Sequence, residues 1–415
     1  MPIHVAYIIL TALGVLVAVP VSVLFVECIA ALLAPRAVFA TGLSRPSKVA
    51  VLISAHNEEL LIQSTVRSLH SQLQPGDQLV VVADNCTDRT AELARAAGAT
   101  VVVRSDPTKR GKGYGLAHGV DFLRASPPDM VIVFDADCAI EAGVVDRLAS
   151  EAWEINRPVQ ARYLLASPSS AGARGTISTL AFIVKNAVRP AGLAALGIPC
   201  ALNGTGMAFP WPLIEKAPLA SGHLVEDMEL GLHFMRIGHG PKLCTAVTIT
   251  GHMPTDMCAA FQQRTRWEHG HLVVICSRAL PLLIEGLLRR RRSLLAMGLD
   301  LTVPPLALLA MVWAAGAAAS LALGIISQHW TPGILFAATG LILMLSVIAA
   351  QRRYARHLPL LALLAVPFYV AWKIPLYLGF VFNRETSWIR TARDAAPKAA
   401  SPAEALPAAA TTTKG

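Results

Sequence analysis

Hydrophobic residues are concentrated at the two ends of the chain, whereas the middle has the mixed composition of a water-soluble domain. The apolar run 6–35 is interrupted only by Glu27, and no formal charge occurs between Asp300 and Arg352. A further apolar block covers 358–382. A helix needs roughly 20 residues to cross about 30 Å of hydrocarbon. The pattern predicts one N-terminal transmembrane anchor in residues 1–35 and about three transmembrane segments in residues 294–383.

The charges beside the first apolar run predict its orientation. The run lacks the basic start of a secretory signal peptide, and its apolar core is longer than the usual ~7–15 residues, which favours a retained anchor. Arg36, Arg45 and Lys48 follow it closely. Because positively charged residues collect on the cytoplasmic side, residues 48–270 are predicted to be cytoplasmic. We therefore expect a multi-pass protein of the bacterial inner (cytoplasmic) membrane that contacts membrane lipids directly.

The C-terminal topology remains open between two interpretations. Arg352, Arg353 and Arg356 agree with two spans that return the chain to the cytoplasm. A third full span would place Arg384 and the basic residues after it outside. Either the proline-broken block 358–382 is partly re-entrant or interfacial, or the charge rule fails here. The Ala/Pro/Thr-rich tail, residues 394–415, is predicted to be disordered.

Short apolar runs alternate with amphipathic segments between residues 48 and 134. Strands are predicted at 48–55, 78–83, 100–103 and 130–134, with helices at 59–73, 88–97 and 112–124. Such alternation is typical of an α/β fold with a mostly parallel, Rossmann-like sheet and right-handed crossovers. In these sheets, ligands bind beyond the carboxyl ends of the strands. Polar residues that directly follow a strand are therefore the candidates for function.

Carboxylates follow three of the predicted strands. Glu58 follows the first, Asp84 the second, and Asp135 and Asp137 follow the fourth. Parallel strands bring these positions to one rim of the sheet, where two carboxylates suit a hard divalent cation such as Mg²⁺. A D-x-D sequence is also common in solvated turns. Its place after a five-residue apolar strand, beside two other polar strand ends, favours a functional site.

Composition narrows the class of protein. Hydrophobic residues make up 54% and charged residues 15% of the 415 positions, against about 25% charged in soluble domains. These values exclude a disordered or collagen-like chain and disfavour a purely soluble enzyme. The seven cysteines form no C-x-x-C pair, which fits a reduced cytoplasmic setting.

The basic residues belong beside the membrane. Residues 271–293 approximate an amphipathic helix that ends in Arg289–Arg292, and we expect this helix to lie at the membrane interface. Apolar membrane segments flank the arginine cluster. Aromatic residues on which nucleic-acid bases could stack do not flank it, so we predict no nucleic-acid partner.

The order of the motifs resembles the membrane-bound, synthase-like branch of family 2 glycosyltransferases, which have the GT-A fold. This branch includes cellulose, hyaluronan and poly-N-acetylglucosamine synthases. Five motifs carry the resemblance over residues 48–270: Ser54-Ala55-His56-Asn57-Glu58-Glu59, Asp84, the D-x-D at Asp135–Asp137, Glu226-Asp227, and the Q-x-x-R-W of Gln263, Arg266 and Trp267. Each motif is weak by itself, but five in this order are specific.

The resemblance implies a role for each motif. Ala55, Glu58 and Asp84 would line the uridine of a UDP-sugar donor, and Lys112 would lie near that donor. Asp135 and Asp137 would bind its diphosphate through Mg²⁺ or Mn²⁺. Asp227 would be the general base of an inverting displacement. Gln263 and Arg266 would reach the diphosphate, and Trp267 would contact the acceptor sugar.

Structural explanations compete with these roles. Glu226-Asp227 is also a common helix start, Lys112 also fits a solvated helix start, and tryptophans such as Trp267 collect at membrane surfaces. The resemblance implies transfer from a UDP-sugar to a glycan or lipid-linked acceptor in surface polysaccharide or exopolysaccharide synthesis, with export subunits as further partners. Processive synthesis and the transfer of a single sugar to a lipid both remain open. The competing class is a non-catalytic nucleotide-binding membrane scaffold or transporter.

Overall fold

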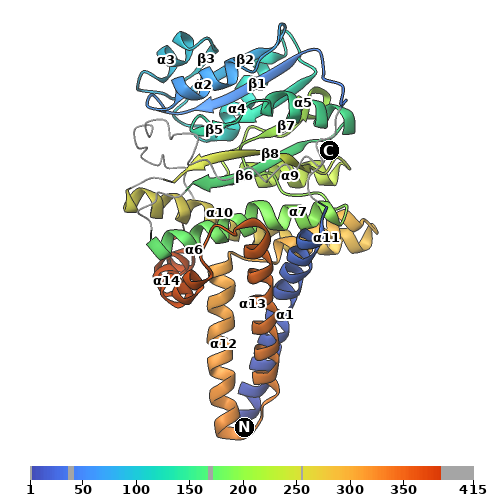
Figure 1. Ribbon diagram of the computed structural model, residues 1–415, viewed down its shortest axis with the longest axis vertical. Helices are drawn as coiled ribbons and strands as arrows, with labels where there is room; N and C mark the ends of the chain where they lie inside the picture. Colours follow the sequence, from blue (N-terminus) through green and yellow to red (C-terminus); the bar gives the residue numbers. More distant parts are fainter. Residues whose placement is uncertain (1, 36–41, 167–171, 254–255, 385–415) are drawn as a thin grey trace, which may run out of the picture.

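The computed structural model describes residues 2–35, 42–166, 172–253 and 256–384. The predicted disordered tail, 394–415, lies outside the described residues. Three levels follow one another along the long axis of the molecule (Figure 1). A β-sheet with its covering helices forms one end, a layer of crosswise helices lies beneath it, and three long helices extend away to the other end.

The sheet has eight strands in the order β3-β2-β1-β4-β7-β6-β8-β5. The neighbours β3, β2, β1 and β4 are parallel, as the alternating pattern predicts, while β7 is antiparallel to both β4 and β6. The α/β expectation is thus confirmed, with an antiparallel element in the second half of the sheet. The strands are β1 (Val49–Ala55), β2 (Gln78–Asp84), β3 (Thr100–Arg104), β4 (Met130–Phe134), β5 (Cys138–Ile140), β6 (Val159–Ala166), β7 (Met207–Pro210) and β8 (Lys242–His252).

Both faces of the sheet are covered, which explains why β1 is apolar at nearly every position. Val49, Val51 and Ile53 belong to one hydrophobic cluster, and Ala50 and Leu52 belong to another on the opposite face. Successive side chains of a strand alternate between faces, so both clusters draw on one strand. The first cluster includes α2 (Ile62–His70), α3 (Thr90–Ala96) and α5 (Val144–Ile155), and the second includes α4 (Lys112–Leu123), α8 (Trp211–Ile214) and α9 (Glu226–Arg236).

A layer of helices separates the sheet from the long helices and runs across them (Figure 1). It contains α6 (Gly172–Ile183), the π-helix η2 (Val184–Val188), α7 (Arg189–Ala195), α10 (Met257–Leu288) and α11 (Arg292–Leu301). The last helix, α14 (Val366–Phe382), follows the short 3₁₀ helix η3 (Leu360–Ala365) and is seen almost end-on in Figure 1. It therefore also runs across the long helices.

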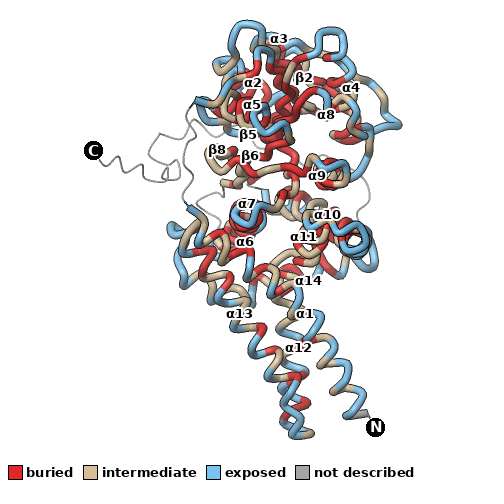
Figure 2. Tube along the Cα trace, turned by 90° about the vertical axis from the view of Figure 1, so that its right-hand side faces the viewer, coloured by how far each residue is buried: buried red, intermediate tan, exposed pale blue. Residues whose placement is uncertain are grey.

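The three long helices α1 (Pro2–Leu33), α12 (Leu306–Ser327) and α13 (Thr331–Tyr354) pack against one another. At their far end, the rings of Tyr7 and His329 lie 5.6 Å apart. At the near end, Arg353 donates to the carbonyls of Leu32 and Ala34 at 3.1 and 2.6 Å. Much of their outer surface is exposed (Figure 2), and it includes apolar side chains such as Leu16.

Five helices of the described chain are long and apolar enough to cross a membrane: Ile3–Leu33, Cys258–Leu288, Leu306–Ser327, Thr331–Tyr354 and Leu360–Phe382. These segments indicate that the protein associates with a membrane, because exposed apolar helices of this length are stable only when lipid or protein covers them.

Helix α10 is longer than the sequence pattern indicates. Residues 271–288 of the predicted interfacial helix 271–293 and the Q-x-x-R-W motif belong to one continuous helix. It begins at Met257, where the Asp256 side chain accepts a hydrogen bond from the Ala259 amide at 2.7 Å. The helix ends at Leu288, and Arg290 adopts a left-handed conformation with φ 53°. Arg289–Arg291 therefore form the turn between α10 and α11, and Arg292 begins α11.

A buried group of three charges joins the long helices to the crosswise layer. Arg189 of α7 donates to Glu27 of α1 at 2.8 Å and to Asp300 of α11 at 2.7 Å. All three residues are buried. A single guanidinium therefore connects three helices that are far apart in the sequence.

Candidate active site

The polar residues after β1 and β2 lie side by side, as their strand positions predict. The Nδ1 atom of His56 is 2.7 Å from the Asp84 carbonyl oxygen, and the Glu58 amide donates to the Thr90 hydroxyl at 2.7 Å. Asp84 is buried and accepts a hydrogen bond from Arg104 at 2.6 Å. Ala55 ends β1 and is buried in the first cluster. These contacts fix the rim where the resemblance places a nucleoside.

Asp135 and Asp137 follow β4 and bring their carboxylate oxygens close together. With the Cys138 sulfur, they form a group of ligand atoms that all lie within 4.8 Å of one another. Burial raises the pKa of the Cys138 thiol well above its ordinary value, and that thiol lies 3.5 Å from the Thr205 hydroxyl. Sulfur is a soft ligand, so the two carboxylates are the hard oxygen ligands of this group. Such a pair fits Mg²⁺ or Mn²⁺, because these ions also take diphosphate oxygens and water.

Lys112 joins the metal-type carboxylates to the next part of the site. From the first turn of α4, its Nζ atom forms an ion pair with Asp135 and donates to the Gly204 carbonyl at 2.6 Å. Gly204 has φ +84°, and a Cβ placed there would lie 3.3 Å from the Asp227 carboxylate. The loop backbone therefore passes directly between Lys112 and Asp227.

Glu226 and Asp227 form the first turn of α9 and face a cavity whose lining also includes Gly113 and Met207. Asp227 accepts a hydrogen bond from the Met228 amide at 2.8 Å. The pKa of Glu226 is raised to about 8. Removal from water is the largest cause, and repulsion from Asp227 is the second. Removal from water also raises the pKa of Asp227, against the opposing field of Lys112. Adjacent carboxyl groups with such shifts are a common sign of proton transfer chemistry.

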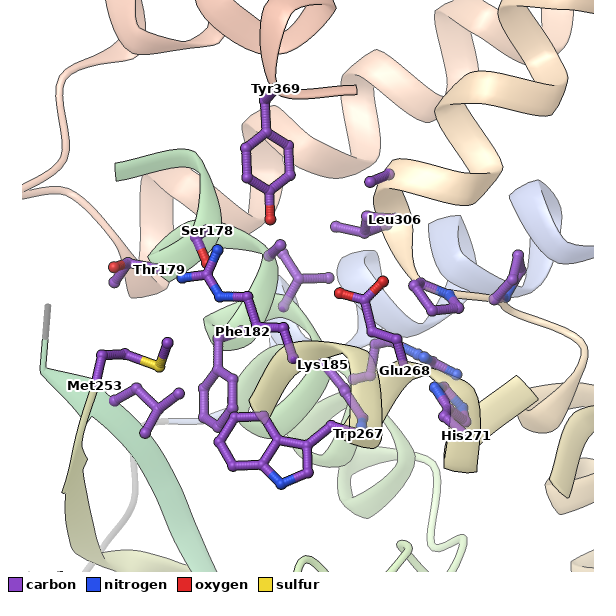
Figure 3. A pocket seen from close by; sticks show the side chains of 18 residues that line it. Ser178, Thr179, Phe182, Lys185, Met253, Trp267, Glu268, His271, Leu306 and Tyr369 are labelled. Carbon is purple, nitrogen blue, oxygen red and sulfur yellow. The ribbon is translucent and has the colours of Figure 1, made fainter. Parts of the chain in front are cut away.

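The Q-x-x-R-W residues lie on α10, below the sheet. Gln263 is buried, and its Oε1 atom accepts no hydrogen bond from the described residues. Arg266 lies one turn further along α10 and is partly buried. Trp267 lines a partly open cavity between the sheet and the long helices, where its ring lies 6.1 Å from that of Phe182 (Figure 3).

The structure thus brings together Lys112, Asp135 and Asp227, and places Asp137 beside Asp135. It places Ala55, Glu58 and Asp84 at the neighbouring strand ends. Trp267 instead lies in the lower cavity.

Residues beyond the sequence motifs also shape the site. Arg104 pairs with Asp84, and the Thr205 hydroxyl accepts a hydrogen bond from the Asp135 amide at 3.1 Å. Lys185 lines the lower cavity with Trp267. Arg104 follows the strand 100–103, so the strand-end rule was the signal that would have found it. Lys185 carries no such signal, because it interrupts an apolar helical run.

Comparison with known proteins defines the class. The model of the family described as "Glycosyltransferase like family 2" matches residues 46–270, more than half of the chain, and the chain belongs to this family. This family assignment agrees with the transferase class that the motifs indicate.

Individual relatives are more distant. A probable glycosyltransferase, YdaM, of Bacillus subtilis is 28% identical over 240 residues, which cover 55% of this chain and 56% of the relative. The 4,4'-diaponeurosporenoate glycosyltransferase of Staphylococcus aureus is 44% identical over 68 residues, which cover 16% and 18%. The chain thus spans little more than half the length of YdaM and less than a fifth of the Staphylococcus aureus enzyme.

A solved structure supports the fold. The mannosyltransferase PcManGT of Pyrobaculum calidifontis, in complex with GDP-Man and Mn²⁺, matches 91% of this chain and 100% of its own chain with a TM-score of 0.55 and 17% identity. This likeness agrees with the GT-A fold that the motifs imply. The complex also shows that a neighbour of this fold binds a divalent metal with its nucleotide sugar.

Proposed function

We propose that this chain is a membrane-bound, metal-dependent, inverting glycosyltransferase that transfers a sugar from a UDP-sugar to a lipid-linked or glycan acceptor. The observation that supports it best is the convergence of Lys112, Asp135 and Asp227 around Gly204. Such a transfer requires a carboxylate that binds the donor, a positively charged side chain paired with it, and a second carboxyl group in a cavity. Asp135, Lys112 and Asp227 are these three groups.

The nucleoside side of the donor would occupy the ends of β1 and β2, against Ala55, Glu58 and Asp84. Asp135 and Asp137 would hold Mg²⁺ or Mn²⁺, which neutralises negative charge on the departing diphosphate. Lys112 would add a second positive charge beside the same phosphates. On the diphosphate side, Gln263 would donate from its side-chain NH₂ group and Arg266 from its guanidinium.

Asp227 would act as the general base. Its carboxylate removes the proton of the acceptor hydroxyl, whose oxygen forms a bond to the anomeric carbon. The bond between that carbon and the diphosphate oxygen breaks, and the electron pair leaves with UDP. One displacement inverts the configuration and needs no covalent enzyme intermediate. The partly accessible position of Asp227 at the cavity wall supports this role.

The membrane arrangement is part of the proposal. We infer that α1, α12 and α13 span the bacterial inner membrane, with the sheet in the cytoplasm, because Arg352 and Arg353 lie at the sheet-proximal end. Helix α14 runs across them and would lie at the interface, which resolves the charge conflict of a third C-terminal span. Surface polysaccharide or exopolysaccharide synthesis, processive or by single transfer, is the setting proposed from the motifs.

The test measures UDP release by the full-length protein in detergent with a panel of UDP-sugars, bacterial lipid extract and Mg²⁺ or Mn²⁺. We expect metal-dependent release that falls about 10²- to 10⁴-fold in Asp227→Asn, the usual contribution of a general base. The matched control is Asp121→Asn, which replaces an exposed carboxylate elsewhere on the surface. Product sizing separates single transfer from polymerisation.

Two results would contradict the proposal. The first is equal release by wild type and Asp227→Asn. The second is UDP binding that is insensitive to Asp135→Asn and to removal of the metal with EDTA.

A further inference from the structure

A second cavity lies beneath the sheet, where the crosswise layer meets the first residues of α12. It is partly open to solvent and draws its walls from α6, η2, α10, α12 and α14. Figure 3 shows Phe182 and Trp267 side by side at one end and Leu306 and Tyr369 toward the other. The cavity thus reaches from the underside of the catalytic domain to the start of a helix that we propose to span the membrane.

The walls of this cavity are mainly apolar. Phe182, Trp267 and Leu306 contribute large hydrophobic surfaces, together with Met253 and Pro305. A free sugar offers little apolar surface to such walls, whereas a hydrocarbon chain is stabilised by them. The chemistry of the walls therefore fits an amphiphile better than a soluble glycan.

The charged groups of the lining, with one exception, already have partners. Arg189 is held by Glu27 and Asp300. Glu268 pairs with Lys373 and accepts from the Tyr377 hydroxyl at 2.7 Å. The Arg264 guanidinium lies 5.8 Å from the centre of the Trp372 ring, and this cation–π contact partly compensates its charge. His271 is held neutral, because removal from water lowers its pKa well below the ordinary value.

Lys185 is the exception. It makes no hydrogen bond or ion pair with the residues that the structure describes. Its side chain is accessible, although removal from bulk water lowers its pKa, and it lines the cavity. It therefore lines the open cavity as an exposed side chain. The backbone at Val184–Val188 is a π-helix, a rare conformation that is frequent at functional sites.

The position of Lys185 also links this cavity to the proposed base. Its positive charge lowers the pKa of Asp227, and the charge of Asp227 acts on Lys185 in return. A head group bound at Lys185 would thus lie within the electrostatic reach of the carboxylate that removes the acceptor proton.

We propose that this cavity binds the acceptor, and that the acceptor is an amphiphile with an acidic head group which Lys185 binds while the apolar walls cover its chain. The inference rests on the proposed function, because it identifies the acceptor class of the same reaction. The chain of the amphiphile enters from the membrane beside Leu306. Its head group forms a charge-assisted hydrogen bond with the Lys185 ammonium.

The test measures direct binding of fluorescently labelled dodecyl phosphate to the full-length protein in phosphatidylcholine nanodiscs. Inorganic phosphate and dodecanol serve as competitors, and UDP binding with Mn²⁺ is measured on the same samples. We compare wild type with Lys185→Met, Lys185→Arg and the exposed-lysine control Lys216→Met. A second variant, Leu306→Trp, fills the cavity without altering its charge.

We expect Lys185→Met to weaken dodecyl phosphate binding at least about tenfold, the usual worth of a hydrogen bond to a charged group. Lys185→Arg and Lys216→Met should bind as wild type, Leu306→Trp should lose binding, and all variants should bind UDP equally. Equal binding by wild type and Lys185→Met would overturn the proposal, as would equal competition by dodecanol or by inorganic phosphate. If wild type binds dodecyl phosphate but does not bind UDP, the result contradicts the proposed function and leaves the amphiphile site standing.

Discussion

At the scale of single residues, the first turn of α9 shows how position changes the chemistry of a carboxyl group. Glu226 and Asp227 are adjacent, face one cavity and share the field of Lys112. Two carboxylates so close resist simultaneous ionisation. Such a pair keeps a proton at a pH where isolated carboxylic acids have lost theirs.

This proton makes stability depend on pH. The pKa of Glu226 is raised from 4.5 to about 8, so between these values the folded state binds more protons than the unfolded state, and stability falls as pH rises. Glu226→Gln removes the titrating carboxyl group, and with it this loss of stability at high pH. We expect the variant to gain melting temperature over wild type at about pH 9 and to match it at about pH 4, measured with EDTA present. An equal difference at both pH values would contradict the assignment.

Some residues of the site could be predicted from the sequence and others could not. Glu58, Asp84 and Asp135 follow apolar strands, so the geometry of a parallel sheet predicts their common rim. Lys185 was not predicted, because its environment arises only when the crosswise layer packs beneath α9. Trp267 was assigned to an acceptor sugar, and its place in the lower cavity required the three-dimensional structure.

At the scale of elements, α4 lies unusually close to the sheet. Gly115 faces Ser54 of β1, and a Cβ at Gly115 would lie 2.1 Å from the Ser54 hydroxyl. Gly119 has the same relation to Leu52 one turn later. These glycines let the helix approach closely enough for Lys112, in its first turn, to reach Asp135.

Adding one methyl group at this contact should move the helix. We expect Gly115→Ala to destabilise the protein by about 1–3 kcal/mol, as overpacking usually does, and to weaken UDP binding because Lys112 shifts with α4. Ser54→Ala in the same chain removes the hydroxyl and should recover part of both losses. Thermal melts and UDP titrations of the two single variants and the double variant measure the coupling. Additive effects of the two changes would contradict the contact.

Sequence periodicity predicted the strands and helices of the first half of the sheet closely, since both faces are covered and every strand is strongly apolar. It misplaced the start of α10, because the motif residues Gln263–Trp267 resembled domain sequence. The helix continues through them because its N-terminus is capped by Asp256 and its other faces pack on α11 and α14.

At the scale of the whole molecule, Arg189 connects α1, α7 and α11 through Glu27 and Asp300. Removing one partner of a buried ion group leaves the others without compensation, which costs about 3–5 kcal/mol. We therefore expect Arg189→Met to lower the melting temperature strongly. The triple variant that adds Glu27→Gln and Asp300→Asn should be more stable than the single variant. A triple variant less stable than Arg189→Met would show that the charges do not act as one unit.

The same connection has a consequence for the choice of substrate. In the membrane arrangement proposed above, the buried ion pair of Arg189 with Glu27 would keep the sheet domain from rising or tilting independently of α1. The reacting centre then stands at a constant height above the lipid surface. The height of the reacting centre above the lipid would then select which acceptors can react. On the proposed function, a hydroxyl that protrudes to that height would be glycosylated, and a chemically identical hydroxyl set deeper or farther out would not react.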